Sequence, residues 1–474
     1  MNGTLPINLA SSSVGTLWAG KVRAFKSDLA QTFLAEVPQP LCVVWQDTSH
    51  KLQIIRDICI FAITSHQTDT RDLGIMYRFR CTIAILILAV VCLLPTAVRG
   101  QGRLVSVLAE RDLSLEQQLD SVIVEFGLDV NKNDIAIAFK LLRRFGGTTR
   151  CVALKYKTQD PKGRAIEASG IVAFPLNRRF RGVVEMCPYN REKNLCGTAR
   201  MYSTEILASS LGYVTIMPDL IGYGVTDSLT VAYQVSENSA ILSAHLRLAA
   251  KEYIENELHL VLPSNSYLFG YSLGAPSAVA LAGLYSSDPS YGVKVKALCV
   301  GGGAYDPRLA LESTLQKGTI NYLIYPSLVR SLNFWCDAGL DPAKIFYGRV
   351  LKDYESLSSS TLNPREMARI YGEDLHTYLR PEFFTPEGSQ ELERIKAILD
   401  TFAVPGAGSQ PIPTSVKVVI RHSENDDIIP VVCADLLYYQ IKQTVPSVRY
   451  HRERKGTHYE TAVRSFSDLA RILL

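Results

Sequence analysis

Short apolar runs alternate with longer helical patterns from about residue 165 to the end of the sequence. Seven runs rich in Val, Ile and Leu are predicted to be strands, at residues 168–174, 182–186, 213–217, 266–269, 295–300, 416–420 and 448–452. Several are almost continuously apolar, as expected for strands that are covered on both faces. Strands that alternate with helices in this way predict an α/β fold, with a mostly parallel sheet flanked by helices.

Residues 236–256 carry the clearest helical pattern between these strands. Ser236 can cap this helix, and Glu237 lies in the first turn, where a negative charge suits the helix dipole. His245 shares one helix face with apolar neighbours, so we interpret it as a packed residue and not as a catalytic one.

The alternation stops between residues 308 and 406, where helical patterns contain many aromatic residues. We interpret this segment as a helical cap inserted over the sheet. The core then comprises residues 165–307 and 407–474, preceded by a lead-in at 101–164. Most of the cap's aromatic side chains are expected to hold it to the core, and a few to line a pocket.

An apolar run near the amino-terminal end predicts export. Met76 is followed by Tyr77-Arg78-Phe79-Arg80 and then by uncharged residues up to Val98. This layout is typical of a secretory signal peptide, here residues 76–100, and predicts a secreted or periplasmic protein. The alternative is a membrane anchor, because the run from Cys81 to Val98 has 18 uncharged residues, near the minimum for a bilayer span. Pro95 and Arg99 favour the signal peptide.

Residues 1–75 precede that segment, although a signal peptide should begin the polypeptide. We therefore expect translation to start at Met76 and interpret residues 1–75 as a non-native upstream extension. The alternative is an additional cytosolic domain, which the lack of sustained periodicity in these residues disfavours.

Composition excludes several classes of protein. The chain has 474 residues, of which 47% are apolar and 20% charged, enough apolar material for a large core and too much for a disordered chain. Lys and Arg number 50 against 46 Asp and Glu, so no basic footprint for nucleic acid is present. We expect a small molecule as partner, with membrane association only through the amino-terminal apolar segment.

Six of the ten cysteines lie after residue 101, and in an exported protein some of these would be paired. Cys187 and Cys196 are close enough in sequence to close a small loop, although spacing alone does not give connectivity. C-x-x-C pairs are absent and the histidines do not cluster at ligand spacing, so no metal site is predicted.

The motif Gly270-Tyr271-Ser272-Leu273-Gly274 joins an apolar strand to a helix rich in small residues. In this context G-x-S-x-G forms a sharp turn that holds its serine exposed above the sheet, and the glycines avoid collisions with neighbouring backbone. Ser272 is therefore the candidate nucleophile. The backbone N–H of Leu273, at the positive end of the helix, is a candidate oxyanion donor.

A serine hydroxyl needs an imidazole to accept its proton and a carboxylate to orient that imidazole. In strand–turn–helix proteins with this motif, the acid and then the histidine follow the serine in sequence. Asp426, after the predicted strand 416–420, is the best acid, and His458, after the last strand, is the best base. Asp427, Glu424 and Asp306 are competing acids, while His451 and His422 are the weaker histidines.

The second oxyanion donor is expected from the loop after strand 182–186. This loop reads Cys187-Pro188-Tyr189-Asn190, which leaves Tyr189 and Asn190 as candidates because proline has no N–H.

From residue 165 onward the chain resembles the α/β-hydrolase superfamily, and is more narrowly similar to secretory lipase-like hydrolases of bacteria and fungi. Besides G-x-S-x-G, the turn Pro218-Asp219-Leu220-Ile221-Gly222-Tyr223-Gly224 resembles their P-D-x-x-G-x-G segment, and His422 to Pro430 resembles their H-G-x-x-D-x-x-V-P segment. Ser423 departs from the usual glycine, and the His-Gly pair of the oxyanion loop is missing. The resemblance implies cofactor-free hydrolysis of carboxylic esters, with Asp426 as triad acid and Asp219 stabilising a turn.

The sequence thus predicts a serine esterase or lipase-like hydrolase that works through an acyl-enzyme on acyl or lipid-like esters. Two alternatives stay open: a serine peptidase acting on short peptides, because both classes share fold and triad, and a catalytically silent binding module on the same scaffold.

Overall fold

The computed structural model describes residues 102–126, 140, 143–144, 146–176, 178–191, 195–201, 206–357, 364–406 and 411–474. The predicted upstream extension and the predicted signal peptide or anchor lie outside these residues, so both stay predictions. Among the helices of the described ranges, none combines the length and the apolar character needed to cross a bilayer.

A single sheet runs through the described residues in the order β1-β2-β3-β5-β4-β6-β7-β8-β9. Its strands are β1 Leu104–Leu113, β2 Thr149–Gln159, β3 Ala165–Pro175, β4 Val183–Cys187, β5 Val214–Pro218, β6 Asn265–Tyr271, β7 Lys294–Gly301, β8 Lys417–Ser423 and β9 Arg449–Glu453. Strands β1 to β3 pair antiparallel with one another, β3 pairs antiparallel with β5, and the remaining neighbours are parallel. The predicted mostly parallel sheet is confirmed.

The seven predicted strands are β3 to β9, with ends that differ by a few residues. Strands β1 and β2 were not predicted, and the sheet therefore begins well before residue 165, inside the segment interpreted as a lead-in. Both strands lie at the antiparallel edge of the sheet, where β1 is largely exposed and carries charged residues. Such a strand lacks the continuous apolar run that marks a buried one.

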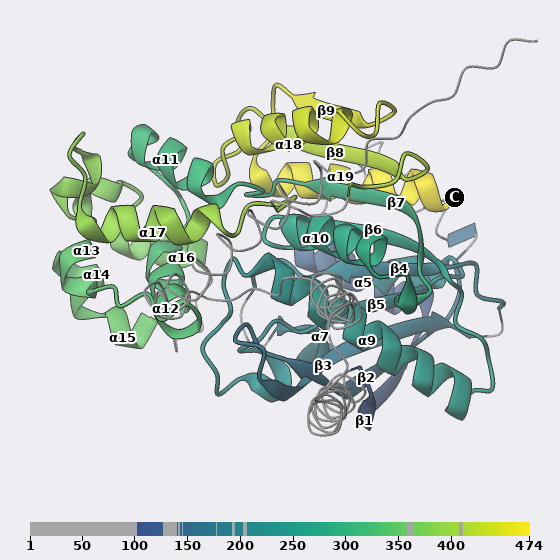
Figure 1. The fold of residues 1–474 in the computed structure, drawn as a ribbon. Helices are drawn as coiled ribbons and strands as arrows, with labels where there is room; N and C mark the ends of the chain where they lie inside the picture. The colour runs from purple at the N-terminus through teal and green to yellow at the C-terminus, as the bar shows by residue number, and fades with distance from the viewer. Residues whose placement is uncertain are drawn as a thin grey trace, which may run out of the picture. The chain divides into compact units, whose positions relative to one another are not determined.

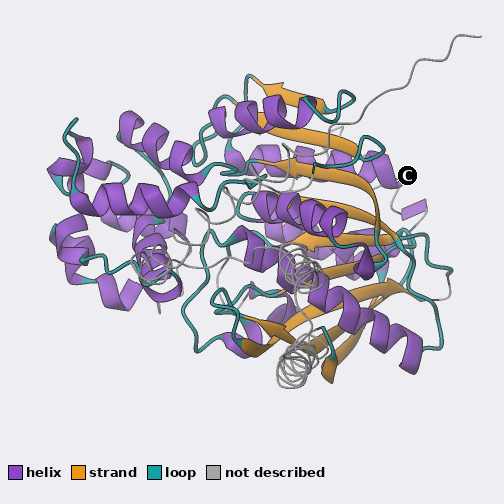
Figure 2. Ribbon diagram, viewed as in Figure 1, coloured by secondary structure: helices purple, strands orange, loops and turns teal. Residues whose placement is uncertain are grey.

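Helices cover both faces of the sheet (Figures 1 and 2). Helices α9 Ser236–Glu257, α10 Gly274–Ser287 and α18 Val432–Lys442 share a core with one face, and α8 Leu207–Ser210 and α19 His458–Leu473 share a core with the other. Alternate residues of β2 divide between the two cores, with Val152 and Leu154 in one and Cys151 and Ala153 in the other. The remaining elements outside the cap are α5 Leu115–Phe126, α7 Gly197–Arg200, η3 Gly224–Thr226 and η4 Pro289–Tyr291.

The predicted cap segment is helical and gathers beside one end of the strands, at the left of Figure 1. It contains α11 Pro307–Lys317, α12 Tyr325–Trp335, α13 Pro342–Ile345, α14 Gly348–Lys352, α15 Tyr354–Leu357, α16 Pro364–Tyr371, η5 Leu375–Thr377, η6 Pro381–Phe384 and α17 Gln390–Asp400. Trp335, Phe346 and Tyr378 are among its fully buried side chains. The aromatic residues of the cap thus serve mostly in packing, as predicted.

The expectation that some cysteines are paired is not met for Cys151, Cys187, Cys196, Cys299 and Cys433, which are buried free thiols. The two cysteines considered for a small loop have different neighbours. Cys187 lies beside the Ser243 hydroxyl of α9, whereas Cys196 lies beside Thr198. Burial raises the pKa of the Cys187 thiol to about 12, which keeps it protonated at neutral pH. These cysteines act as small apolar core residues.

His245 is a packed residue of α9, in agreement with the sequence interpretation. Its ring is buried and its Nδ1 lies 2.9 Å from the Thr158 hydroxyl of β2. Burial lowers its pKa to about 4, so the imidazole is neutral at neutral pH.

A buried carboxylate joins the elements that surround the turn between β6 and α10. Glu185 of β4 pairs with Arg247 of α9, at 2.8 Å between Oε1 and Nη1, and both side chains are buried. The same carboxylate accepts hydrogen bonds from Ser266 of β6 and Tyr285 of α10. Arg247 also donates to the Pro263 carbonyl at 2.8 Å. Because every charge is partnered, two strands and two helices are held in one arrangement.

Replacement of Arg247 by methionine should lower the free energy of unfolding by about 3–5 kcal/mol, because it leaves the Glu185 carboxylate buried without its cation. Arg150→Met is the matched control, since Arg150 pairs with Asp112 at 2.7 Å in a half-exposed position. That change should cost no more than about 1 kcal/mol. Urea denaturation measures both values, and equal losses would contradict the role given to the buried pair.

Candidate active site

The turn between β6 and α10 has the geometry that the G-x-S-x-G motif predicts. Strand β6 ends at Tyr271, α10 begins at Gly274, and Ser272 between them has a φ of 53°. A positive φ is strained for a residue other than glycine and persists only where the surrounding structure imposes it. Hydrogen bonds from Ser272 N to Gly301 O and from Ala275 N to Ser272 O, both 3.0 Å, hold it there.

Both glycines of the motif are required by close backbone packing. A Cβ on Gly270 would lie 2.1 Å from the carbonyl oxygen of Gly274, and a Cβ on Gly274 would lie 2.1 Å from that of Cys187. The second approach brings the loop after β4 directly against the start of α10. Ser272 therefore lies between the helix amino terminus and the loop from which the second oxyanion donor was predicted.

Asp426 and His458 are brought together, as the sequence predicted. His458 Nδ1 lies 2.8 Å from Asp426 Oδ2, and both side chains are almost fully buried. The other carboxylate oxygen accepts hydrogen bonds from the backbone N–H groups of Ile428, at 3.0 Å, and Ile429, at 2.8 Å. These bonds fix the plane of the carboxylate and hence the orientation of the imidazole.

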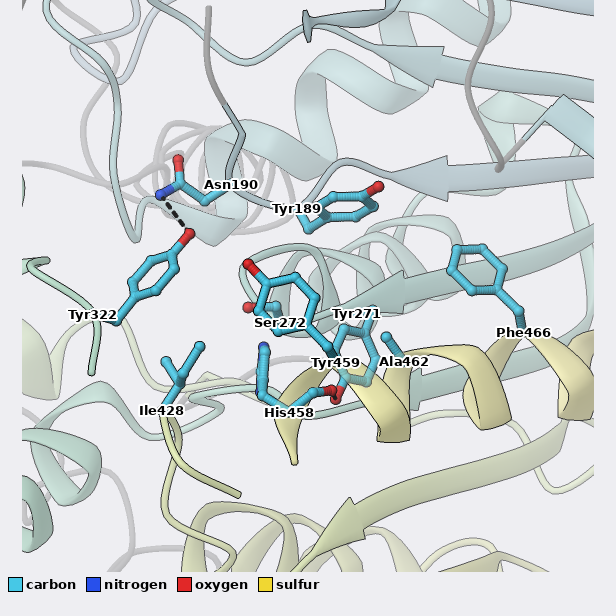
Figure 3. A pocket seen from close by; sticks show the side chains of 10 residues that line it. All are labelled: Tyr189, Asn190, Tyr271, Ser272, Tyr322, Ile428, His458, Tyr459, Ala462 and Phe466. Atoms are coloured by element: carbon cyan, nitrogen blue, oxygen red, sulfur yellow. Dashed lines mark hydrogen bonds between the residues drawn. The ribbon is translucent and has the colours of Figure 1, made fainter. Parts of the chain in front are cut away.

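The carboxylate is kept ionised by its neighbours. Burial raises the pKa of Asp426, but the adjacent His458 and His422 side chains more than offset this and hold that pKa well below its usual range. An ionised Asp426 favours the His458 tautomer that carries its proton on Nδ1. His458 Nε2 is then the atom that can accept a proton, and Figure 3 shows this ring beside Ser272.

The competing carboxylates have other partners. Asp427 accepts a hydrogen bond from the backbone N–H of His458 at 3.0 Å. Glu424 pairs with Arg452 at the surface, and Asp306 caps helix α11 by accepting from Leu309 N at 2.8 Å. Of the carboxylates considered from the sequence, only Asp426 contacts the His458 ring in the described structure.

The competing histidines, His451 and His422, are not among the described residues that line the pocket with Ser272. His451 lies on β9, and His422 is completely buried, with Nε2 at 3.0 Å from the Ile429 carbonyl and at 3.4 Å from Asp426 Oδ2. His422 thus supports the loop that carries Asp426, in keeping with the structural task expected for it.

One small pocket contains Ser272 and His458. It is lined by Tyr189, Asn190, Tyr271, Ser272, Tyr322, Ile428, His458, Tyr459, Ala462 and Phe466 (Figure 3). The cavity bounded by the described residues measures about 60 Å³. Tyr189 and Asn190, the two candidate oxyanion donors, lie on its wall. Leu273, the other candidate, directly follows Ser272 and precedes the first turn of α10.

The Asn190 side chain is engaged in the pocket wall. Its Nδ2 donates to the Tyr322 hydroxyl at 3.5 Å, and its Oδ1 accepts from the Tyr223 hydroxyl at 3.2 Å. These contacts connect the loop after β4 to the cap residue Tyr322. The Asn190 amide side chain is therefore a structural link, and a donor from this loop would be a backbone N–H.

Several pocket residues escaped sequence reasoning. Tyr271 occupies a variable position of the motif, yet its hydroxyl donates to the His458 carbonyl at 2.5 Å. Tyr322 comes from the cap, and Tyr459 and Phe466 come from α19. Tyr271 and Tyr459 carried a signal in their adjacency to Ser272 and His458. Tyr322 is one of the cap aromatic residues, of which a few were expected to line a pocket.

Asp219, to which the resemblance assigned a turn-stabilising task, links β3 to α7. Its buried carboxylate accepts from the Ser169 hydroxyl at 2.7 Å and from both the backbone N–H and the hydroxyl of Thr198. Across the residues that the structure describes, no group of three or more His, Cys, Asp or Glu side chains is placed to hold a metal ion.

Comparison with known proteins finds likeness in structure alone. No protein-family model and no curated protein sequence matches the chain. The structure is similar to that of a protein from Legionella pneumophila assigned as a hydrolase, with 18% identity and a TM-score of 0.62 over 78% of this chain and 97% of that one. It is also similar to the rice cell wall degrading esterase LipA from Xanthomonas oryzae, with 15% identity and a TM-score of 0.61 over 79% and 97%.

A third similar structure is lipase A from Candida antarctica, with 12% identity and a TM-score of 0.53 over 76% of this chain and 78% of that one. These likenesses, together with the sheet order and the turn at Ser272, show that the chain has the α/β-hydrolase fold.

Gly274→Ala should lower the free energy of unfolding by about 1–3 kcal/mol, since the added methyl group forces the backbone of Cys187 away from α10. Gly283→Ala, in the same helix, is the control because a Cβ there would meet no atom within 4 Å. That variant should gain roughly 0.5–1 kcal/mol from improved helix propensity. Urea unfolding of both proteins tests the argument, which fails if Gly274→Ala is as stable as the unsubstituted chain.

Proposed function

We propose that the chain is a serine hydrolase that cleaves carboxylic esters of small acyl groups through an acyl-enzyme. The observation that carries this proposal is the hydrogen bond between Asp426 and His458 beside Ser272, which has the strained conformation of a nucleophile on a strand-to-helix turn. The similarity in fold to an esterase and a lipase supports the same reaction class.

In the acylation step, Ser272 Oγ attacks the ester carbonyl carbon while His458 Nε2 accepts the hydroxyl proton. The imidazolium that forms is stabilised by the Asp426 carboxylate, which has its second oxygen held by two backbone N–H groups. The negative charge on the carbonyl oxygen develops near the amino terminus of α10, where the Leu273 N–H and a backbone N–H of the Tyr189–Asn190 loop are the proposed donors.

Collapse of the tetrahedral intermediate breaks the bond to the alcohol oxygen, and His458 returns its proton to the departing alcohol. Water then attacks the acyl-serine by the same route, with His458 again accepting a proton. Product acid leaves, and Ser272 recovers its hydroxyl proton. All of these proton transfers use side chains present in the pocket.

The size of the pocket favours a small acyl group. Ligand pockets for larger molecules usually measure about 300–1,000 Å³. The cavity of about 60 Å³ is well below this range, and aromatic rings form much of its wall. A long acyl chain would require the cap residue Tyr322 or the side chains of α19 to move.

Ser272→Ala should abolish hydrolysis of p-nitrophenyl acetate, lowering kcat by at least about a thousandfold, because it removes the hydroxyl proposed to form the acyl-enzyme. The variant should also lose labelling by a fluorophosphonate probe. Ser286→Ala is the control, since its hydroxyl is bonded to the Ala282 carbonyl farther along α10. Full ester turnover by folded Ser272→Ala would refute the proposal, and faster turnover of aminoacyl p-nitroanilides than of esters would favour a peptidase.

Among p-nitrophenyl esters, acetate and butyrate should be cleaved with a kcat/KM at least about tenfold higher than palmitate, because each added methylene must find space in a small cavity. Tyr322→Ala, which removes a ring from the pocket wall, should shift the preference to longer chains. Initial rates across a graded ester series measure both effects. A preference of the unsubstituted chain for palmitate would show that the cavity does not limit the substrate.

A further inference from the structure

The second aspartate of the loop after β8 lies between the cap and the candidate general base. Asp427 Oδ1 accepts the backbone N–H of His458 at 3.0 Å. Its Oδ2 accepts from two cap side chains, Asn321 Nδ2 at 2.5 Å and the guanidinium of Arg365. One carboxylate therefore bonds the backbone of His458 on one side and the cap on the other.

The two cap donors are held in a fixed relation to each other. Arg365 lies in the first turn of α16, and Asn321 lies in the segment between α11 and α12. Backbone hydrogen bonds from Leu323 N to Pro364 O and from Ile320 N to Glu373 O, both 2.9 Å, tie that segment to the two ends of α16. A displacement of α16 would therefore move both donors together.

His458 is fixed at three points, only one of which belongs to the triad geometry. As the first residue of α19 it has an N–H without a partner inside the helix, and Asp427 supplies the acceptor. Its carbonyl accepts the Tyr271 hydroxyl, and its ring is bonded to Asp426. Without the hydrogen bond to Asp427, the backbone of His458 at the start of α19 could shift and move the imidazole with it.

Arg365 also contacts the residue that follows His458. Its guanidinium lies over the Tyr459 ring, 4.7 Å from the centroid, and Tyr459 forms part of the pocket wall (Figure 3). The same cap residue thus acts on both His458, through Asp427, and Tyr459, directly.

We propose that Asp427, held by Arg365 and Asn321, is a positioning residue through which the cap sets the location of His458 relative to Ser272. The proposal rests on the proposed function, because it assigns the cap a part in the proton transfer that His458 performs. Displacement of a general base by a fraction of an ångström slows chemistry without weakening substrate binding. The cap then contributes to turnover itself in addition to covering the pocket.

The test is a double-substitution cycle on p-nitrophenyl acetate hydrolysis, with Arg365→Met, Asp427→Asn and the pair combined. Each single change should lower kcat by about tenfold while KM stays within about threefold. The combined variant should be no slower than the poorer single variant, since both changes break the same connection. Arg365→Lys loses the planar contact with the Tyr459 ring but keeps a cation beside Asp427, and should therefore recover kcat to within roughly threefold of the unsubstituted chain.

Arg349→Met is the matched control. Arg349 also lies on the cap, pairs with an aspartate, Asp353, at 3.5 Å, and has its guanidinium 4.8 Å from the centroid of the Tyr371 ring. It lies outside the pocket wall, so its loss should leave kcat unchanged. If Arg365→Met does not fold, Arg365→Gln and Asn321→Ala can replace it in the cycle with Asp427→Asn, because each removes one of the two cap contacts of Asp427.

An unchanged kcat in folded Arg365→Met would overturn the proposal. So would a combined variant in which the loss of kcat equals the product of the two single losses, because the two residues would then act independently. A rise in KM alone would also overturn it, because Arg365 would then act on substrate binding. Failure of the proposed function gives a different result, since the unsubstituted chain would then show neither ester turnover nor fluorophosphonate labelling.

Discussion

Close packing of backbone against backbone at the turn between β6 and α10 is the constraint on which the candidate site depends. The carbonyl of Gly274 lies against Gly270, and the carbonyl of Cys187 lies against Gly274, at separations that leave no room for a side chain. This packing holds Ser272 at a positive φ and brings the loop after β4 beside it. The buried network around Glu185 joins the strands and helices on either side of this turn, and a strained conformation persists only where the surrounding structure imposes it.

Two buried carboxylates near the site, those of Glu185 and Asp219, both accept several hydrogen bonds. Glu185 is held by Arg247, Ser266 and Tyr285, whereas Asp219 is held by Ser169 and Thr198. Unpaired, each would cost several kcal/mol of folding free energy or would take up a proton, on the order of the penalties known for buried charges. With donors in place, each becomes a rigid connection between elements that are distant in the sequence.

The sequence predicted the buried strands, the Ser272 turn and the meeting of Asp426 with His458, because each leaves a local signature. Apolar runs mark β3 to β9, small residues mark the turn, and chain order points to Asp426 and His458. Strand β1 escaped because it is a largely exposed edge strand that needs no apolar run. Strand β2 is buried, but Arg150, Lys155 and Lys157 interrupt its apolar residues. The hydrogen bonds of Tyr271 and Tyr322 could not be predicted, since they depend on where the hydroxyl of one residue meets a distant partner. The cysteines were misjudged because composition cannot distinguish a core thiol from half of a disulfide.

Asp426 and Asp427 have the same chemistry and adjacent positions, yet their surroundings give them different tasks. Asp426 is buried, receives two backbone N–H groups and faces the His458 ring, so its negative charge acts on the imidazole. Asp427 is partly exposed, faces the amino terminus of α19 and is bonded to two cap side chains. Because consecutive side chains of a turn point in different directions, one short loop can orient the ring of His458 and anchor its backbone. The core thereby orients the ring of His458, and the cap anchors its backbone through Asp427. A helical insertion that is distant in the sequence can in this way act on the same histidine.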